Sequence, residues 1–204
     1  MNRFLFLIDK TSAWVGKAFA WSILIMTFGV SYEVFVRYVL RDPTSWAFDI
    51  SYMMYGILFM MAGAYTLSRD GHVRGDVLYR LWPPRYQAMI EFVLYFLFFF
   101  PGVLALIYAG YDYARESWSY TEVSVMSPAG VPIYQFKSII PVAGFFLFLQ
   151  GIAQVIRCVI CIKTGEWPKR LHAVEEMETV LLHQHENHER HLAETAEHGA
   201  ESGR

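Results

Sequence analysis

The chain has 204 residues, of which 55% are hydrophobic, 17% are aromatic and only 18% are charged, and its formal net charge is −2. This apolar content is higher than a soluble domain can usually bury, so the composition excludes an ordinary water-soluble domain. The sequence predicts an integral membrane protein.

Four uncharged windows have about the length of a membrane span, which takes about 20 apolar residues in a helix. They cover residues 18–32, 50–68, 92–111 and 138–156, and they predict spans at about 14–37, 47–68, 88–111 and 136–160. We expect an all-α membrane domain over residues 1–165, followed by a tail over residues 166–204. The first window has no small-residue cleavage site before Glu33, so a retained span is expected rather than a signal peptide.

Two charged residues close the first span. Glu33 and Arg37 are four residues apart, which places them on one face of a helix, and Asp42-Pro43 then interrupts the helical pattern. An ion pair that anchors the span at the interface is the favoured interpretation. A transport site and a contact with a partner subunit are the alternatives.

The connections between spans predict the orientation of the chain. Thirteen of the seventeen Lys and Arg residues lie in the N-terminal arm, in residues 69–85 or after the fourth uncharged window. The positive-inside rule therefore predicts that both termini are cytoplasmic. Residues 69–88 alternate basic and apolar side chains, which predicts an interfacial cytoplasmic segment between the second and third spans. The connections on the opposite side, residues 37–49 and 112–137, are expected to face outward.

Polar residues within the four windows are few, and none of them is charged. Gln150 and Gln154 share one face of the fourth span, while Gly56 and Gly63 give the second span a small-residue surface. These features favour close packing and hydrogen bonds between helices. Pro101 is expected to bend the third span and Pro141 the fourth. Cys158 and Cys161, in the fourth span, are expected to act as small packing residues.

No charged residue lies inside the four windows, which argues against catalysis within the membrane. A membrane cytochrome needs axial histidines in the bundle, yet His72 is the only histidine before the tail. We expect no catalytic, substrate-binding or metal-binding residue and no cofactor. The tail contains HQHENHERH, which could bind a divalent cation, but a solvated helix or a disordered tail is the favoured interpretation.

The segment YEVFVRYVLRDPTSWAFDISYMMYGILFMMAGAYTLSRDGHVRGDVLY resembles the DctQ-type small membrane subunit of tripartite ATP-independent periplasmic (TRAP) transporters. The resemblance covers about residues 10–162. Its elements are Arg37-Tyr38, Trp46 with Asp49, Gly63-Ala64-Tyr65, and His72-Val73-Arg74 with Asp76.

The resemblance implies a bacterial cytoplasmic (inner) membrane complex with three parts. A periplasmic substrate-binding protein captures a substrate, usually an organic acid, and a large multi-span subunit imports it with sodium. The small subunit would be a non-catalytic scaffold that braces the large one. We expect it to contact membrane lipids and no nucleic acid.

The residues expected to fasten the helices or contact the partner are Glu33, Arg37, Trp46, Asp49, His72, Arg74 and Asp76. Two other functions remain open. An autonomous four-helix carrier would use Glu33 as its site, and an assembly subunit of another membrane complex would share most of these features.

Overall fold

The computed structural model describes residues 2–69 and 82–168, and the regular structure in those residues is helical. Four stretches are long and apolar enough to cross a membrane: Phe4–Leu40, Ala47–Ser68, Pro84–Ser119 and Tyr134–Thr164. The prediction of an all-α membrane protein with four spans is therefore confirmed. The predicted interfacial segment lies mostly, and the tail almost wholly, outside the described residues.

The first span is one long, nearly continuous helix. It consists of α1 (Asn2–Ala20), α2 (Ser22–Phe35) and the π-helical turn η1 (Val36–Leu40). The helix extends beyond the predicted span of residues 14–37 at both ends. Its early start follows from burial at helical spacing, since Leu5, Asp9 and Ser12 all lie on the buried face of α1. Arg41 ends the helix with a left-handed backbone (φ 57°), two residues before Pro43.

The second span is the uninterrupted helix α3 (Ala47–Ser68). The third comprises α5 (Pro84–Leu94), the π-helical turn η2 (Tyr95–Phe99) and α6 (Phe100–Ser119). A proline ring clashes with the carbonyl four residues before it, and for Pro101 that residue is Leu97, within η2. Just before Pro101, where the sequence predicts a bend, the helix contains a widened turn.

The fourth span begins with the short helix α7 (Tyr134–Lys137) and continues as α8 (Ile139–Thr164). The break at Ser138 lies three residues before Pro141, which again matches the region where a proline disturbs the preceding turn. Gly165 then closes α8 in a left-handed conformation (φ 85°), and its amide donates to the carbonyl of Cys161.

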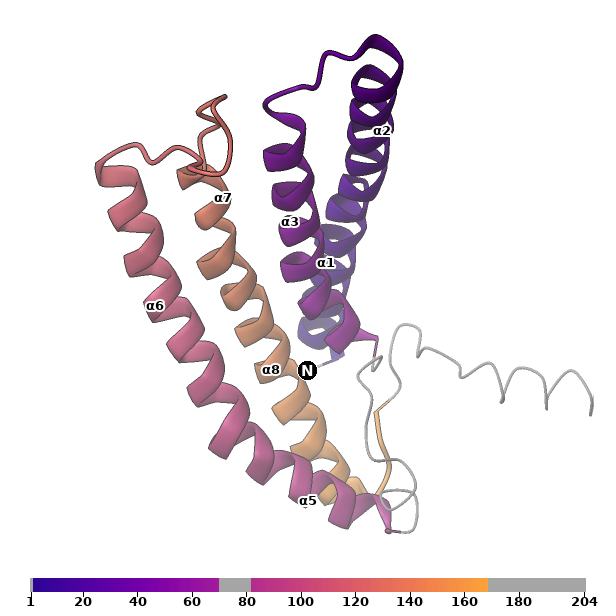
Figure 1. The fold of residues 1–204 in the computed structure, drawn as a ribbon. Coiled ribbons are helices and arrows are strands. Elements are labelled where there is room, and N and C mark those ends of the chain that lie inside the picture. The colour runs from indigo at the N-terminus through magenta and orange to yellow at the C-terminus, as the bar shows by residue number, and fades with distance from the viewer. Residues whose placement is uncertain (1, 70–81, 169–204) are drawn as a thin grey trace, which may run out of the picture. The chain divides into compact units, whose positions relative to one another are not determined.

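Helices α3 and α8 pack against each other at the centre of the described bundle (Figure 1). Helices α1 and α2 pack on α3, α1 also reaches α8, and α5 and α6 pack on α8. The glycine surface predicted on the second span lies at the central contact: Gly56 faces Phe136 and Gly63 faces Leu147. A Cβ atom at Gly56 would lie 2.5 Å from the Phe136 ring, so a larger residue would require that ring to shift.

Large apolar side chains cover much of the outer surface of these helices. Trp14, Trp21 and Phe28 on the first span and Tyr108 on α6 are each at least 67% exposed. A water-soluble protein rarely exposes apolar patches of this extent, whereas a membrane protein presents them to lipid or to a partner helix.

Candidate functional site

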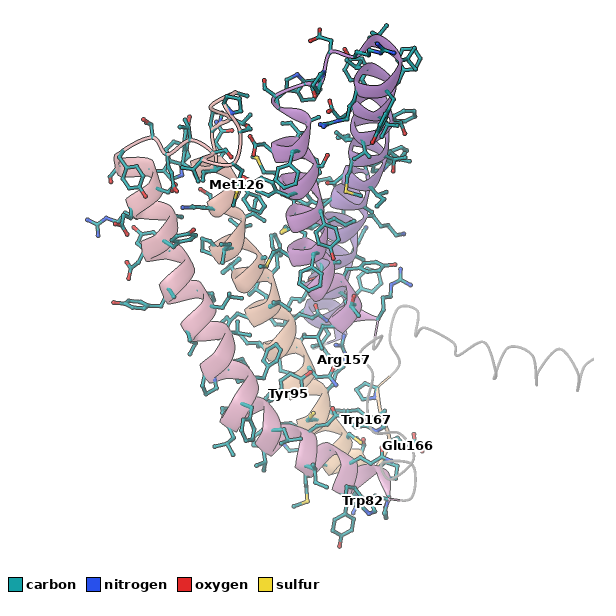
Figure 2. All side chains as sticks on the ribbon, in the orientation of Figure 1. Trp82, Tyr95, Met126, Arg157, Glu166 and Trp167 are labelled. Carbon is teal, nitrogen blue, oxygen red and sulfur yellow. The ribbon has the colours of Figure 1, made fainter. Side chains whose placement is uncertain are left out.

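The bundle has two ends, which we name by their contents. The connection end holds residues 41–46 and 120–133, and the terminal end holds the starts of α1 and α5 and the ends of α3 and α8. Figure 2 shows Met126 at the connection end and Arg157 on the part of α8 toward the terminal end. Polar side chains join neighbouring helices at both ends.

Glu33 links the end of the first span to the segment that precedes α3. One carboxylate oxygen accepts hydrogen bonds from Arg37, with Nε at 2.9 Å. The other accepts from the backbone amide of Thr44 at 3.0 Å and from the Thr44 hydroxyl. The two charges that the sequence places on one helix face therefore form an ion pair, and Glu33 also holds the 41–46 connection.

Trp46 lies beside this pair and stacks on Tyr32 of α2, with ring centroids 6.2 Å apart and planes at 20°. Trp46 is 40% exposed and the Arg37 side chain is 51% exposed. Part of each of these two side chains is thus accessible to lipid or to another protein. The Glu33 side chain is largely covered (13% exposed).

Asp49 is completely buried, and it joins α3 to the connection between the third and fourth spans. Its carboxylate accepts hydrogen bonds from the hydroxyls of Ser124, at 2.7 Å, and Ser127. These serines were not singled out in the sequence, because nothing local to them indicates a partner 75 or more residues away. Both carboxylate oxygens of Asp49 are therefore hydrogen-bonded within the chain.

A second carboxylate, Glu122, fixes the base of the same connection. It accepts hydrogen bonds from Ser117 at 2.6 Å, from Tyr120 at 3.2 Å and from the ammonium of Lys137. The Lys137 hydrogen bond is the main reason why the pKa of Glu122 is lowered below its usual value. Partial burial, followed by the charge of Glu122, raises the pKa of Tyr120.

The terminal end contains a buried ion pair that connects α1 to α8. Arg157 donates to Asp9, and Asp9 also accepts from the side-chain amide of Gln150 at 2.8 Å. The Ser12 hydroxyl donates to the Gln150 carbonyl oxygen at 3.1 Å. Neither charge is more than 5% exposed at its side chain. Gln150 thus makes the kind of interhelical hydrogen bond expected from the sequence, but the role of Asp9 was missed.

A neighbouring cluster connects α5 to α8. Gln154 donates its side-chain amide to Glu91 at 3.1 Å, and the thiol of Cys158 lies 3.7 Å from the same carboxylate. Cys161 contacts the carbonyl of Pro84. Both cysteines are fully buried beside Ala88, which agrees with the packing role expected for them. A useful signal was present in the sequence: Glu91 and Arg157 each lie within one residue of an uncharged window.

The structure brings only part of the predicted set together. Glu33, Arg37, Trp46 and Asp49 all lie at the connection end, although Asp49 faces a different loop from the other three. His72, Arg74 and Asp76 fall outside the described residues, as does the histidine-rich tract of the tail. Within residues 2–69 and 82–168, no group of three or more His, Cys, Asp or Glu side chains is placed to hold a metal ion.

Residues 26–160 match the family model described as "Tripartite ATP-independent periplasmic transporters, DctQ component". The match covers about two thirds of the 204 residues and includes every span in whole or in part. A comparison with curated proteins finds no significant match. The DctQ family is a non-catalytic component of transporters that also contain a large membrane subunit and a binding protein. This chain therefore belongs to the DctQ family: it is the small, multi-pass membrane component of a TRAP transporter.

Proposed function

We propose that this chain is the scaffold subunit that braces the large subunit of a sodium-coupled, binding-protein-dependent importer of an organic acid. The sodium coupling and the substrate class follow from the family resemblance. The bracing role is supported by one observation above all. The buried charged side chains of the described residues, Asp9, Asp49, Glu91, Lys137 and Arg157, all hydrogen-bond to other side chains of the chain.

These contacts connect segments that are distant in sequence. Asp9 joins the first span to the fourth, Asp49 joins the second to the 120–133 connection, and Glu91 joins the third span to the fourth. A bundle connected in this way at both ends resists sliding of its helices. Such resistance suits a fixed platform against which a mobile part of the large subunit could move.

The exposed apolar surface supports the same role, because it offers a broad area for a second membrane protein. In this proposal Glu33 and Asp49 fasten the chain internally. Arg37 and Trp46, which are more exposed, contact the large subunit, together with His72, Arg74 and Asp76 on the opposite side of the membrane. Both termini are cytoplasmic and the connection end faces the periplasm of a bacterial inner membrane.

The autonomous-carrier alternative is less well supported, because both oxygens of Glu33 already accept hydrogen bonds within the chain. The two functions give opposite results in purified systems. A scaffold subunit should copurify with one large membrane protein at equal stoichiometry and should transport nothing alone in liposomes. An autonomous carrier should transport substrate alone.

Substitution tests the contact residues. Arg37→Ala and Arg74→Ala are expected to lower the yield of the two-subunit complex and the uptake that it supports. Arg115→Ala, which changes an exposed arginine on α6, provides a control for loss of positive charge. Unchanged yield and uptake in both Arg37→Ala and Arg74→Ala would refute the assignment of these residues.

A further inference from the structure

The outer face of α1 carries a stripe in which cationic and indole side chains alternate: Lys10, Trp14, Lys17 and Trp21. These residues are separated by steps of four, three and four, so they lie above one another on successive turns of one helix face. The opposite face of α1 packs on the bundle and buries Leu5, Asp9 and Ser12. We call the exposed set the outer stripe.

The outer stripe offers hydrogen-bond donors that the described part of the chain leaves free. Neither lysine belongs to an ion pair of the described residues. Trp118 and Trp167 donate their indole N–H groups to side chains of the chain, whereas Trp14 and Trp21 have no such acceptor among the described residues. Trp14 (72%) and Trp21 (67%) are also the two most exposed of the six tryptophans. The stripe therefore presents donors and positive charge without an acceptor.

The outer stripe lies where the first span leaves the hydrocarbon layer. The span Phe4–Leu40 has 37 residues. Its length is thus about 55 Å, while the hydrocarbon core is about 30 Å thick, so the ends of the span lie among headgroups. The uncharged window begins at residue 18, directly after Lys17. Because helical side chains lean toward the N-terminus, Lys17 extends away from the hydrocarbon and toward Lys10.

The composition of the two faces of α1 distinguishes lipid contact from contact with another helix. Helices in membranes pack closely at small residues. The inner face of α1 does so at Gly16, where an added Cβ atom would lie 2.5 Å from the Cβ atom of Tyr65 on α3. The outer stripe contains lysine and tryptophan instead, which anchor helices at the boundary between hydrocarbon and headgroups. This face is therefore built for lipid.

We propose that the outer stripe binds the headgroup of an anionic phospholipid. The ammonium groups of Lys10 and Lys17 pair with its phosphate, and the indole N–H groups of Trp14 and Trp21 donate to oxygens of the headgroup and the ester region. A zwitterionic lipid binds less tightly, because its own cation competes for the phosphate. The site goes beyond the scaffold role and requires only that the chain spans a membrane. A lipid bound here holds α1 at a fixed depth.

The test measures which lipids contact Trp14 in the two-subunit complex. The complex is reconstituted in phosphatidylcholine vesicles that contain increasing fractions of brominated phosphatidylglycerol or brominated phosphatidylcholine, both of which quench tryptophan. The contribution of Trp14 is the difference between the unaltered complex and Trp14→Phe. The fraction of phosphatidylglycerol that gives half-maximal quenching should be about fivefold or more lower than that of phosphatidylcholine, since a lysine near the surface contributes about this much.

Lysine variants assign this preference to the outer stripe. Lys10→Gln/Lys17→Gln should make the two lipids quench Trp14 equally, whereas Lys10→Arg/Lys17→Arg should retain the preference because it retains both charges. Lys163→Gln is the matched control, since Lys163 is an exposed lysine at the same end of the bundle on α8. It should leave the preference unchanged. All of these side chains are exposed, so the variants should unfold at the temperature of the unaltered complex.

Three results would overturn the proposal. Equal quenching by the two lipids in the unaltered complex would show that the stripe does not select a headgroup. A preference that survives in Lys10→Gln/Lys17→Gln would place the lipid elsewhere. Quenching of Trp14 in the isolated chain but not in the complex would show that the large subunit covers this face, which would leave the scaffold function intact.

Discussion

The ion pair between Asp9 and Arg157 shows how strongly single residues constrain this bundle. Both side chains are nearly inaccessible to solvent, and a charge in a region of low polarity is tolerated only when it is paired and hydrogen-bonded. Gln150 and Ser12 extend the hydrogen-bond network around Asp9. Removing one member of the pair therefore measures how much the pair contributes to the free energy of unfolding.

Asp9→Asn should destabilise the protein by about 3–5 kcal/mol, because it leaves the Arg157 charge buried without a counter-charge. The double variant Asp9→Leu/Arg157→Met should recover most of this loss, since it removes both charges. Unfolding in mild detergent measures the difference, with Lys10→Ala on the exposed face of α1 as a control. A double variant less stable than either single one would contradict this account.

Glu122 gives the connection end a defined pH dependence. Its folded pKa lies below the usual value of 4.5, mainly because Lys137 donates a hydrogen bond to the carboxylate. The stabilisation is therefore fully present above about pH 4.5 and is lost as the pH falls through the lowered pKa. We expect the 120–133 loop to be unaffected between pH 7 and pH 5.

The amides of Ser124 and Ile133 donate to the carbonyls of Val131 and Glu122, which closes the 120–133 loop. Hydrogen exchange at these two amides, corrected for the intrinsic effect of pH, measures this dependence. Protection should fall only below about pH 4.5 in the unaltered chain. Glu122→Gln should show weaker protection at neutral pH and a smaller change on acidification. Loss of protection between pH 7 and pH 5 would show that another group controls the loop.

At the scale of helices, packing depends on where glycine meets a neighbour. A Cβ atom at Gly110 of α6 would lie 2.7 Å from Ile140 and 3.3 Å from the backbone nitrogen of Pro141. Gly102, eight residues earlier on the same helix, has nothing within 4 Å of that position. The same residue type therefore has different roles at the two sites.

Gly110→Ala should destabilise the bundle by about 1–3 kcal/mol, because the crowded backbone at Pro141 cannot move freely. Gly102→Ala should be neutral or slightly stabilising, since alanine favours a helix more than glycine by about 1 kcal/mol. Thermal unfolding of the two variants in the same detergent compares them directly. Equal effects would show that α6 and α8 are not packed as closely as described.

The helices could be predicted from the sequence because each depends on a local pattern of apolar residues. The irregularities near Pro101 and Pro141 were also local, since a proline disturbs the turn before it. The partners of Asp9 and Asp49 could not be predicted, because hydropathy contains no information about which helix faces which. Asp9 was further hidden by its position before the predicted first span, where an acidic residue suggests exposure.

At the scale of the whole molecule, the distribution of Lys and Arg predicts one orientation in the membrane. A membrane-impermeant thiol reagent applied to intact spheroplasts should label Val125→Cys, because Val125 lies in the 120–133 connection and is 91% exposed. It should not label cysteines added at either terminus until the membrane is opened. The unaltered chain is the control, because its two cysteines are buried. Labelling of a terminal cysteine in sealed spheroplasts would show that this terminus lies outside, which contradicts the predicted topology.

The pairing of Asp9 with Arg157 also has a consequence for biosynthesis. The two residues are 148 positions apart, and ribosomes add roughly 5–20 residues per second. The first span is thus made about 7–30 s before its counter-charge, and any partly synthesised chain contains an unpaired acid at its terminal end. Completion of the fourth span supplies Arg157, so a chain that stops short of this residue retains Asp9 without its counter-charge.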